Sequence, residues 1–261
     1  MGVINIFQNE ATPQRSGFAE RLVTDHAAGG GRDLLAPLKD NLPAQKVLFG
    51  LLSRKIAWVP LERLGELVHL PAEPLYRVLS LLEDMDLLQA GHSQRIKYYK
   101  IKNWRSTFQG YVMLELSRDI PLRKKHYLLD GVDEAAVLVR MGRVLAGSRM
   151  QYGLTGVFPH DYARDPALAR GPHHFHVGSG WETDRVMQAL RLRECAPERA
   201  NVVLLLDQCP LGLEMVIRRV KGQQLCGSLQ VYLDFLSGRV GNRVDPEQLW
   251  RRHFPVDAAL N

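Results

Sequence analysis

Three amphipathic stretches followed by two strand-like runs, all between residues 42 and 102, are the feature that most restricts how this chain can fold. Apolar residues recur at helical spacing in each stretch, and the IAWVP segment after the first is typical of a strand. Asn41 can cap the first helix, and Pro71 and Pro74 fit only the first turn of the third. We expect the third helix to bury Leu75, Val78, Leu79, Leu82 and Met85 and to expose Glu73, Tyr76, Arg77 and Ser80.

The segment LLQAGHSQRIKYYKIK has two strand-like runs around a Gly-His-Ser-Gln turn, which is typical of a hairpin. The resulting order of helix, strand, helix, turn, helix and hairpin resembles the winged helix-turn-helix module. In that module the third helix enters the major groove of DNA, and the hairpin meets phosphates. The expected DNA-binding residues are Glu73, Tyr76, Arg77 and Ser80 on the helix and His92, Ser93, Gln94, Arg95 and Lys97 on the hairpin. A small helical subdomain, or a winged helix that contacts only proteins, fits the same pattern.

The charge distribution favours a polyanionic partner. The formal net charge is +6, with 34 Lys and Arg against 28 Asp and Glu. Residues 42–104 carry nine basic and six acidic side chains, whereas residues 131–261 carry sixteen and fourteen. Arg95, Lys97, Lys100 and Lys102 form the densest basic run in the chain. This run lies on the expected hairpin, where a wing would contact the DNA backbone.

The second half of the chain has a mixed pattern of helices and strands. We expect strands at residues 105–116, 172–180, 201–207 and 213–220, a helix or turn at 152–163, and helices at 133–147, 182–192, 228–238 and 246–254. Asp130 or Asp133 can cap the first of these helices, and Ser228 the helix at 228–238. Strands separated by helices indicate one sheet flanked by helices.

The expected fold class is therefore mixed α+β, with three parts. Residues 1–41 form an N-terminal arm with a short helix in SGFAERLVTDHAA and a flexible GGGR break. Residues 42–104 form the winged helix-turn-helix domain. Residues 105–261 form an α/β domain whose small mixed sheet is flanked by helices.

The sequence offers little support for catalysis or for a bound cofactor or metal. His173, His174 and His176 suggest a metal site, because alternate strand residues point the same way, but no further ligand follows at a suitable spacing. We therefore expect these histidines to lie on a partly exposed strand. Asp207, Glu214 and Lys221 are too loosely spaced for a nuclease site. No phosphate-binding loop, dinucleotide fingerprint or nucleophile elbow occurs. The pattern favours a protein that is not an enzyme.

Cellular context follows from what the sequence lacks. The longest apolar run, at residues 202–206, is far too short to cross a bilayer, and the first residues do not form a secretory signal. Cys195, Cys209 and Cys226 fit neither a disulfide framework nor a paired-cysteine metal site. We therefore expect a cytoplasmic protein with no membrane partner.

Three short patterns in the second half are similar to the C-terminal domain of AbiEi-type antitoxins of bacterial type IV toxin-antitoxin systems. The first is YGLTG, with Tyr152, Leu154, Thr155 and Gly156, and the second is NVVLL, with Asn201, Val202, Leu204 and Leu205. The third is LQVYLDF, with Gln230, Tyr232, Leu233 and Asp234, where Phe235 replaces the usual leucine. The resemblance covers roughly residues 42–255, although the N-terminal arm is longer than in the family.

This resemblance implies a sequence-specific DNA-binding regulator that represses its own promoter. Its implied partners are double-stranded operator DNA with repeats, a nucleotidyltransferase toxin, and a second copy of the chain on DNA. Two other classes of function fit the residues. One is a nucleic-acid-processing enzyme whose winged helix delivers the substrate, and the other is a winged-helix module that binds proteins.

Overall fold

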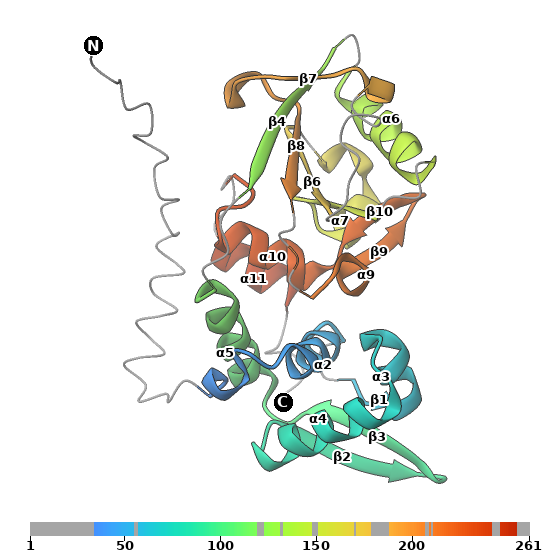
Figure 1. Cartoon of the computed structure of the whole chain (residues 1–261), viewed down its shortest axis with the longest axis vertical. Helices are drawn as coiled ribbons and strands as arrows, with labels where there is room; N and C mark the ends of the chain where they lie inside the picture. The colour runs from blue at the N-terminus through green and yellow to red at the C-terminus, as the bar shows by residue number, and fades with distance from the viewer. Residues whose placement is uncertain are drawn as a thin grey trace, which may run out of the picture.

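The computed structural model describes residues 34–54, 57–118, 123–130, 133–147, 151–169, 171–178, 188–206, 209, 211–241 and 246–254. It has the expected mixed α+β class, with a small three-stranded sheet near the N-terminus and a seven-stranded sheet in the second half. Figure 1 shows helices α10 (Ser228–Leu236) and α11 (Pro246–His253) lying between the larger sheet and the helices of the first half. None of the helices in these ranges combines the length and apolarity that a bilayer crossing needs.

The first half follows the element order that the sequence predicts. A short helical turn, η1 (Ala36–Leu38), precedes α2 (Leu42–Leu52), β1 (Val59–Pro60), α3 (Leu61–Val68), α4 (Ala72–Asp84), β2 (Leu88–Ser93) and β3 (Ile96–Ile101). The Asn41 side chain caps α2 by accepting a hydrogen bond from the Ala44 backbone N–H, at 3.0 Å. The three strands pair antiparallel in the order β1-β3-β2. Helix, strand, helix, turn, helix and hairpin are therefore all present.

One expected strand is a helix. Residues 105–116, read from the sequence as a strand, belong to α5 (Trp104–Leu116). The Asn103 side chain caps this helix by accepting from the Ser106 backbone N–H, at 3.1 Å. The buried residues Trp104, Phe108 and Tyr111 recur every three or four positions and so form a helical stripe. The strand prediction was wrong because many of these residues are aromatic or β-branched, types that strands also favour.

The larger sheet has seven strands in the order β7-β4-β8-β6-β5-β10-β9, more than the sequence indicated. Strands β6 and β8 pair in parallel, as do β5 and β10, and the remaining neighbours are antiparallel. Short helices connect several of them. The elements are β4 (Lys124–Leu129), α6 (Glu134–Gly147), β5 (Tyr152–Thr155), α7 (Pro159–Arg164), η2 (Pro166–Leu168), β6 (His173–Val177), β7 (Leu192–Glu194), η3 (Pro197–Arg199), β8 (Val202–Leu206), α9 (Leu213–Val216), β9 (Ile217–Val220) and β10 (Gln223–Cys226).

Several second-half predictions need correction. The segment 152–163 is a strand followed by helix α7, and 213–220 is the short helix α9 followed by β9. The predicted helix at 182–192 lies mostly outside the described residues, and β7 begins at Leu192. Gly227, and not Ser228, stands at the N-cap of α10, without a side-chain cap. Asp133 does cap α6, because it accepts from the Ala136 backbone N–H at 2.7 Å.

The hydrophobic core continues across the predicted domain boundary at residues 104 and 105. One cluster of buried residues extends from Leu35 through α2, α4 and α5 to α10 and α11, and a second fills the space between the sheet and α6. Leu35 and Leu38, which the sequence placed in the arm, are fully buried in the first cluster. The arm helix predicted in SGFAERLVTDHAA lies outside the described residues. The two halves of the chain therefore share the first of these clusters.

Candidate functional site

Helix α4 presents the residues that the sequence predicts for DNA contact. Leu75, Val78, Leu79 and Leu82 are buried against the rest of the first half. Glu73, Tyr76, Arg77 and Ser80 are all exposed on the opposite face, and Tyr76 retains 52% of its accessible surface. Met85 is only half-buried, because it follows the last residue of the helix. The amphipathic spacing fixes this orientation.

Arg77 forms an ion pair with Glu73 one turn earlier on α4, with Nη2 and Oε1 2.5 Å apart. The two side chains are 78% and 76% exposed, so water screens the pair and its contribution to stability is small. A phosphate or a base edge can therefore replace Glu73 as the partner of Arg77 at little cost.

The hairpin extends away from the rest of the first half (Figure 1). Its turn lies at Gln94 and Arg95, so that only Gln94 of the predicted Gly-His-Ser-Gln turn belongs to it, and Gly91 to Ser93 lie in strand β2. Both turn residues have positive φ angles, 49° and 70°, as two-residue hairpin turns with the correct twist require. Gly91 lies within β2, where a Cβ atom would meet the Trp58 ring at 3.2 Å. His92, Ser93, Gln94 and Arg95 are all exposed around the tip.

Lys97 on β3 contacts both the hairpin and the end of α4. Its Nζ is 4.8 Å from the centre of the Tyr99 ring and 3.7 Å from Glu83 Oε2. Its side chain is 30% exposed, and the hydrogen bond to Tyr99 raises the pKa of Lys97. The structure therefore separates Lys97 from the exposed residues at the hairpin tip, with which the sequence grouped it.

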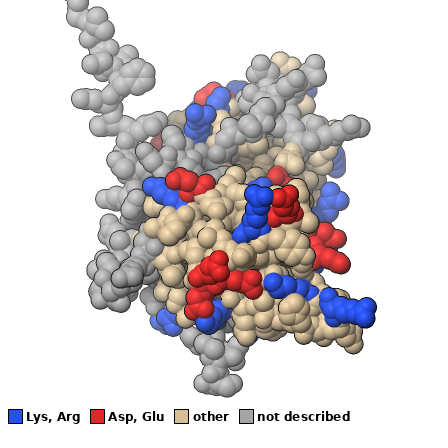
Figure 2. Space-filling model, turned by 60° about the horizontal axis from the view of Figure 1, so that its bottom comes forward, with Lys and Arg blue, Asp and Glu red and all other residues tan. Residues whose placement is uncertain are grey.

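The basic run of the hairpin is dispersed in three dimensions. Lys100 Nζ lies 4.6 Å from the centre of the Trp58 ring, and Lys102 Nζ lies 2.5 Å from Asp86 Oδ1. Figure 2 shows basic and acidic side chains interspersed over this end of the molecule, without a continuous basic patch. Arg95, at the exposed tip, is the member of the run best placed to meet a phosphate. The sequence did not single out Trp58, which is 42% exposed and directly precedes the two-residue strand β1.

In the second half, polar residues from three distant segments meet at the buried Asp234 on α10. Asp234 Oδ2 accepts from Thr155 Oγ1 and lies against His176 Nε2, each at 2.7 Å. Asp234 Oδ1 accepts from Gln230 Nε2 at 2.8 Å, and Arg239 Nη1 lies 3.4 Å away. Thr155, Gln230 and Asp234 belong to two of the patterns on which the AbiEi resemblance rests.

The electrostatics of this cluster are those of a buried ion pair. Burial by itself lowers the pKa of His176, but the Asp234 carboxylate outweighs burial and raises that pKa to about 10. Burial also acts to raise the pKa of Asp234, whereas His176 lowers it, and the net pKa lies below its ordinary value. The pair is therefore charged near neutral pH. The sequence-based interpretation of the histidines as a partly exposed strand was wrong, since His173, His174 and His176 are all buried.

The same cluster includes a set of potential metal ligands. Ligand atoms of His176, Cys226 and Asp234 lie within 4.8 Å of one another. Both carboxylate oxygens of Asp234 are already occupied by hydrogen-bond donors, and the Arg239 guanidinium adds positive charge beside them. This environment favours the His176–Asp234 ion pair over a bound metal cation. Of the residues considered for a nuclease site, Asp207 lies outside the described residues, Glu214 lies in α9 and Lys221 lies in the turn between β9 and β10.

Comparison of the chain with protein-family models, with curated proteins and with solved structures finds no match.

Proposed function

We propose that residues 42–104 act as a winged helix-turn-helix that binds duplex DNA, and that the chain is a sequence-specific transcriptional regulator. One observation carries this proposal: the outer face of α4 is exposed from Glu73 to Ser80, beside a hairpin that extends from the same unit. This is the arrangement in which a recognition helix enters the major groove while a wing meets the flanking phosphates.

The connection between α3 and α4 supports the proposal. Three residues, His69 to Pro71, separate the two helices, and His69 has the left-handed conformation, with φ of 52°. A short turn of this kind is typical of helix-turn-helix motifs. Tyr76 and Arg77 lie in the N-terminal half of α4, the part of a recognition helix that contacts base edges.

The small number of exposed cations on residues 42–104 limits the affinity of a single copy for DNA. Arg77 and Arg95 are the exposed cations nearest the proposed interface, and acidic residues lie at the other end of α4. Since phosphate contacts supply much of DNA affinity, we expect one copy to bind modestly. Two copies on a repeated operator would strengthen binding, as in other regulators of this type. A role at an operator places the chain in the cytoplasm.

The resemblance to AbiEi-type antitoxins extends the proposal to repression of the chain's own promoter and to neutralisation of a nucleotidyltransferase toxin. Two of the resembling segments meet in one buried cluster, where Thr155 and Gln230 both donate hydrogen bonds to Asp234. This contact supports a shared structural role for the two segments. We propose that the second half, from α5 onward, provides the toxin-directed activity and the contacts between copies.

The experiment that tests DNA binding is selection of ligands for the full-length chain from a random duplex DNA pool. An enriched motif that binds at least about 10³-fold more tightly than random DNA would support the proposal. If no DNA sequence is enriched above background, the proposal is contradicted. Cleavage of the selected DNA in the presence of Mg²⁺ would instead favour a nucleic-acid-processing enzyme.

A protein partner is the second candidate, because specific features of the same surface favour it. Glu83, Asp84 and Asp86 make one end of α4 acidic, and Tyr76 and Ile96 expose apolar surface, 52% and 44% of each residue. Exposed aromatic and aliphatic side chains are typical of protein interfaces. Failure of the chain to bind heparin or DNA at moderate salt would favour this candidate over the regulator.

A further inference from the structure

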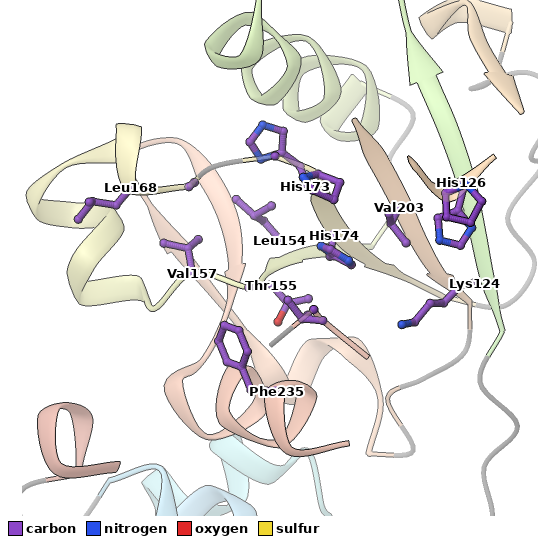
Figure 3. A pocket seen from close by; sticks show the side chains of 17 residues that line it. Lys124, His126, Leu154, Thr155, Val157, Leu168, His173, His174, Val203 and Phe235 are labelled. Carbon is purple, nitrogen blue, oxygen red and sulfur yellow. The ribbon is translucent and has the colours of Figure 1, made fainter. Parts of the chain in front are cut away.

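A pocket of about 500 Å³ opens between strands β4, β5 and β6 and helix α10. Figure 3 shows that its two sides differ in character. Lys124, His126 and His174 lie on one side, and Val157, Leu168 and Phe235 lie on the other. The volume falls within the range of about 300–1,000 Å³ that is usual for small-molecule sites. The pocket therefore has room for a ligand that is polar at one end and apolar at the other.

The polar side of the pocket carries positive charge without an opposing acid. None of the described residues that line the pocket is Asp or Glu. Lys124 Nζ donates one hydrogen bond, to the Gly238 carbonyl at 2.9 Å, and an ammonium group has three donors. Asp234 acts on Lys124 and opposes the lowering of its pKa, but the Asp234 carboxylate already pairs with His176 and accepts from Thr155. Lys124 thus lacks a dedicated counter-ion in this part of the structure.

The two imidazoles beside Lys124 are neutral near pH 7. Burial, together with the charge of Lys124, lowers the pKa of His174 to about 4, while Asp234 opposes that shift and His126 adds to it. Burial and Lys124 also lower the pKa of His126, and Glu198 on η3 opposes the change. Burial lowers the pKa of Lys124, and the positive charge of Arg239 lowers it further. The net pKa shifts of Lys124, His126 and His174 are all downward, so the surroundings of the pocket disfavour an additional cation and favour an anion, although Asp234 and Glu198 act in the opposite sense.

We propose that this pocket binds a small organic anion, with its phosphate or carboxylate group beside Lys124, His126 and His174 and a flat apolar group against Val157, Leu168 and Phe235. Charge complementarity fixes the anionic end, since the lining offers cationic and imidazole donors but no acidic acceptor. The apolar side chains on the other side of the pocket favour an apolar group for the rest of the ligand. This inference does not depend on DNA binding, because the residues that carry it lie outside residues 42–104.

Binding couples to protonation through the two imidazoles. An anion beside His126 and His174 stabilises their charged forms and raises both pKa values. The protein therefore takes up protons when an anion binds, and the affinity for a carboxylate rises as the pH falls toward the pKa values of these histidines. An uncharged ligand of the same shape produces neither effect.

The test is titration calorimetry of the full-length chain with two matched pairs of probes. Adenosine 5′-monophosphate and adenosine form the phosphate pair, and 1-naphthoate and 1-naphthalenemethanol form the carboxylate pair. We expect at least one anion to bind with 1:1 stoichiometry and more tightly than its uncharged partner, and the pair that responds identifies the anionic group. If neither anion binds at millimolar concentration, or if each uncharged partner binds as tightly as its anion, the proposal is wrong.

Matched variants locate the site. Lys124→Met removes the cation of the pocket, whereas Lys125→Met removes the adjacent, exposed lysine of the same strand. We expect the first to weaken anion binding about ten- to hundredfold, the range for a lost hydrogen bond to a charged group, and the second to leave it unchanged. Equal losses in both variants would contradict binding in the pocket. If Lys124→Met does not fold, the wild-type chain still provides the test, through its preference for each anion over the uncharged partner of the same shape; absence of that preference in both pairs would contradict the proposal.

Discussion

His176 Nε2 lies 2.7 Å from Asp234 Oδ2 inside the core, although 58 residues separate the two in the chain. Neither side chain is more than 1% exposed. The pair connects β6, near the middle of the large sheet, to α10, which packs against the sheet on one side and against α5 on the other. A buried ion pair with additional hydrogen bonds is therefore placed where the two halves of the chain meet.

Replacement of Asp234 by Asn should destabilise the chain strongly. The variant keeps the side-chain volume but leaves the His176 and Arg239 cations buried without their carboxylate. Removal of one member of a buried pair costs about 3–5 kcal/mol. Urea unfolding measures the loss, with Asp84→Asn, an exposed position on α4, as the control. A loss no larger than that of the control would show that the pair contributes little.

His174 and His176 should change the free energy of unfolding with pH in opposite directions, although they lie two residues apart on one strand. The pKa of His176 is about 10 in the folded chain against an ordinary value of 6.5, so the folded state binds more protons between these values. Its stabilising contribution is complete below pH 6.5 and is lost as the pH rises to about 10. The pKa of His174 is about 4, so its contribution is complete above pH 6.5 and is lost as the pH falls to about 4.

Urea unfolding at a series of pH values checks both signs. Substitution of His176→Gln should remove part of the decline in the free energy of unfolding above pH 6.5. Substitution of His174→Gln should instead remove part of the decline below pH 6.5. If the free energy of unfolding depends on pH identically in the two variants, the opposite pKa shifts assigned to His174 and His176 are wrong.

The sequence was sufficient to predict the elements of the first half because their signals are local. The apolar spacing of α4 and the cap at Asn41 each depend on residues only a few positions apart. The exposed positions of Glu73, Tyr76, Arg77 and Ser80 follow directly from that spacing. The turn of the hairpin was misplaced because Gly91 suggests a turn, whereas its role is to leave room for the Trp58 ring.

The second half depended more on contacts distant in sequence. Strand β4 was not recognised because its sequence, KKHYLL, is too polar at its start to resemble a buried strand, and pairing with β7 and β8 on both sides stabilises it. The meeting of Thr155, His176 and Asp234 could not be predicted, since three separate segments supply these residues. The pocket was missed for the same reason: Lys124 and His174 come together only when β4, β8 and β6 lie side by side.

Substitution of Arg77→Ala should weaken specific DNA binding by about 1–3 kcal/mol if the side chain contacts a base, and should relax the sequence preference at that base pair. The fold should remain intact because the lost ion pair with Glu73 is exposed. Arg63→Ala is a suitable control, since Arg63 forms a similar exposed pair with Glu66 on α3. Gel-shift titration against the selected motif and its single-base variants gives the comparison; an unchanged preference in Arg77→Ala would remove this residue from the base-reading site.

The salt dependence of DNA binding should distinguish the contributions of Arg95 and Lys97. From the sequence alone, two phosphate contacts on the hairpin would flatten the slope of log K against log salt concentration by about 2 in the double alanine variant. Because Lys97 forms an ion pair with Glu83, we now expect Arg95→Ala to reduce the slope by about 1 and Lys97→Ala to reduce it by less. Arg164→Ala, on the exposed surface of α7, should have no effect. A larger change in Lys97→Ala than in Arg95→Ala would reverse this assignment.

Substitution of Trp104→Ala should destabilise both halves of the chain together. Trp104 is 5% exposed, its ring stacks on Phe108 with centroids 4.7 Å apart, and its Nε1 donates to the Leu52 carbonyl of α2 at 3.3 Å. The same ring lies 5.7 Å from that of Trp250 on α11, so it joins the first half of the chain to α11. Loss of a buried tryptophan costs about 3–5 kcal/mol.

Because the first cluster of buried residues is continuous through Trp104, we expect the full-length chain to unfold in one transition. In Trp104→Ala the whole transition should shift to a lower urea concentration. Circular dichroism reports on all helices, and near-ultraviolet absorbance of the buried tyrosines Tyr111 and Tyr152 reports on both clusters. Val139→Ala, an exposed position on α6, is the control and should leave the midpoint unchanged. For the same reason a fragment that ends near Asn103 should unfold, whereas one that ends near Arg118 retains α5 and should be more stable. Two separate transitions in the full-length chain would show that the halves fold independently and that the boundary predicted at residue 104 is the physical one.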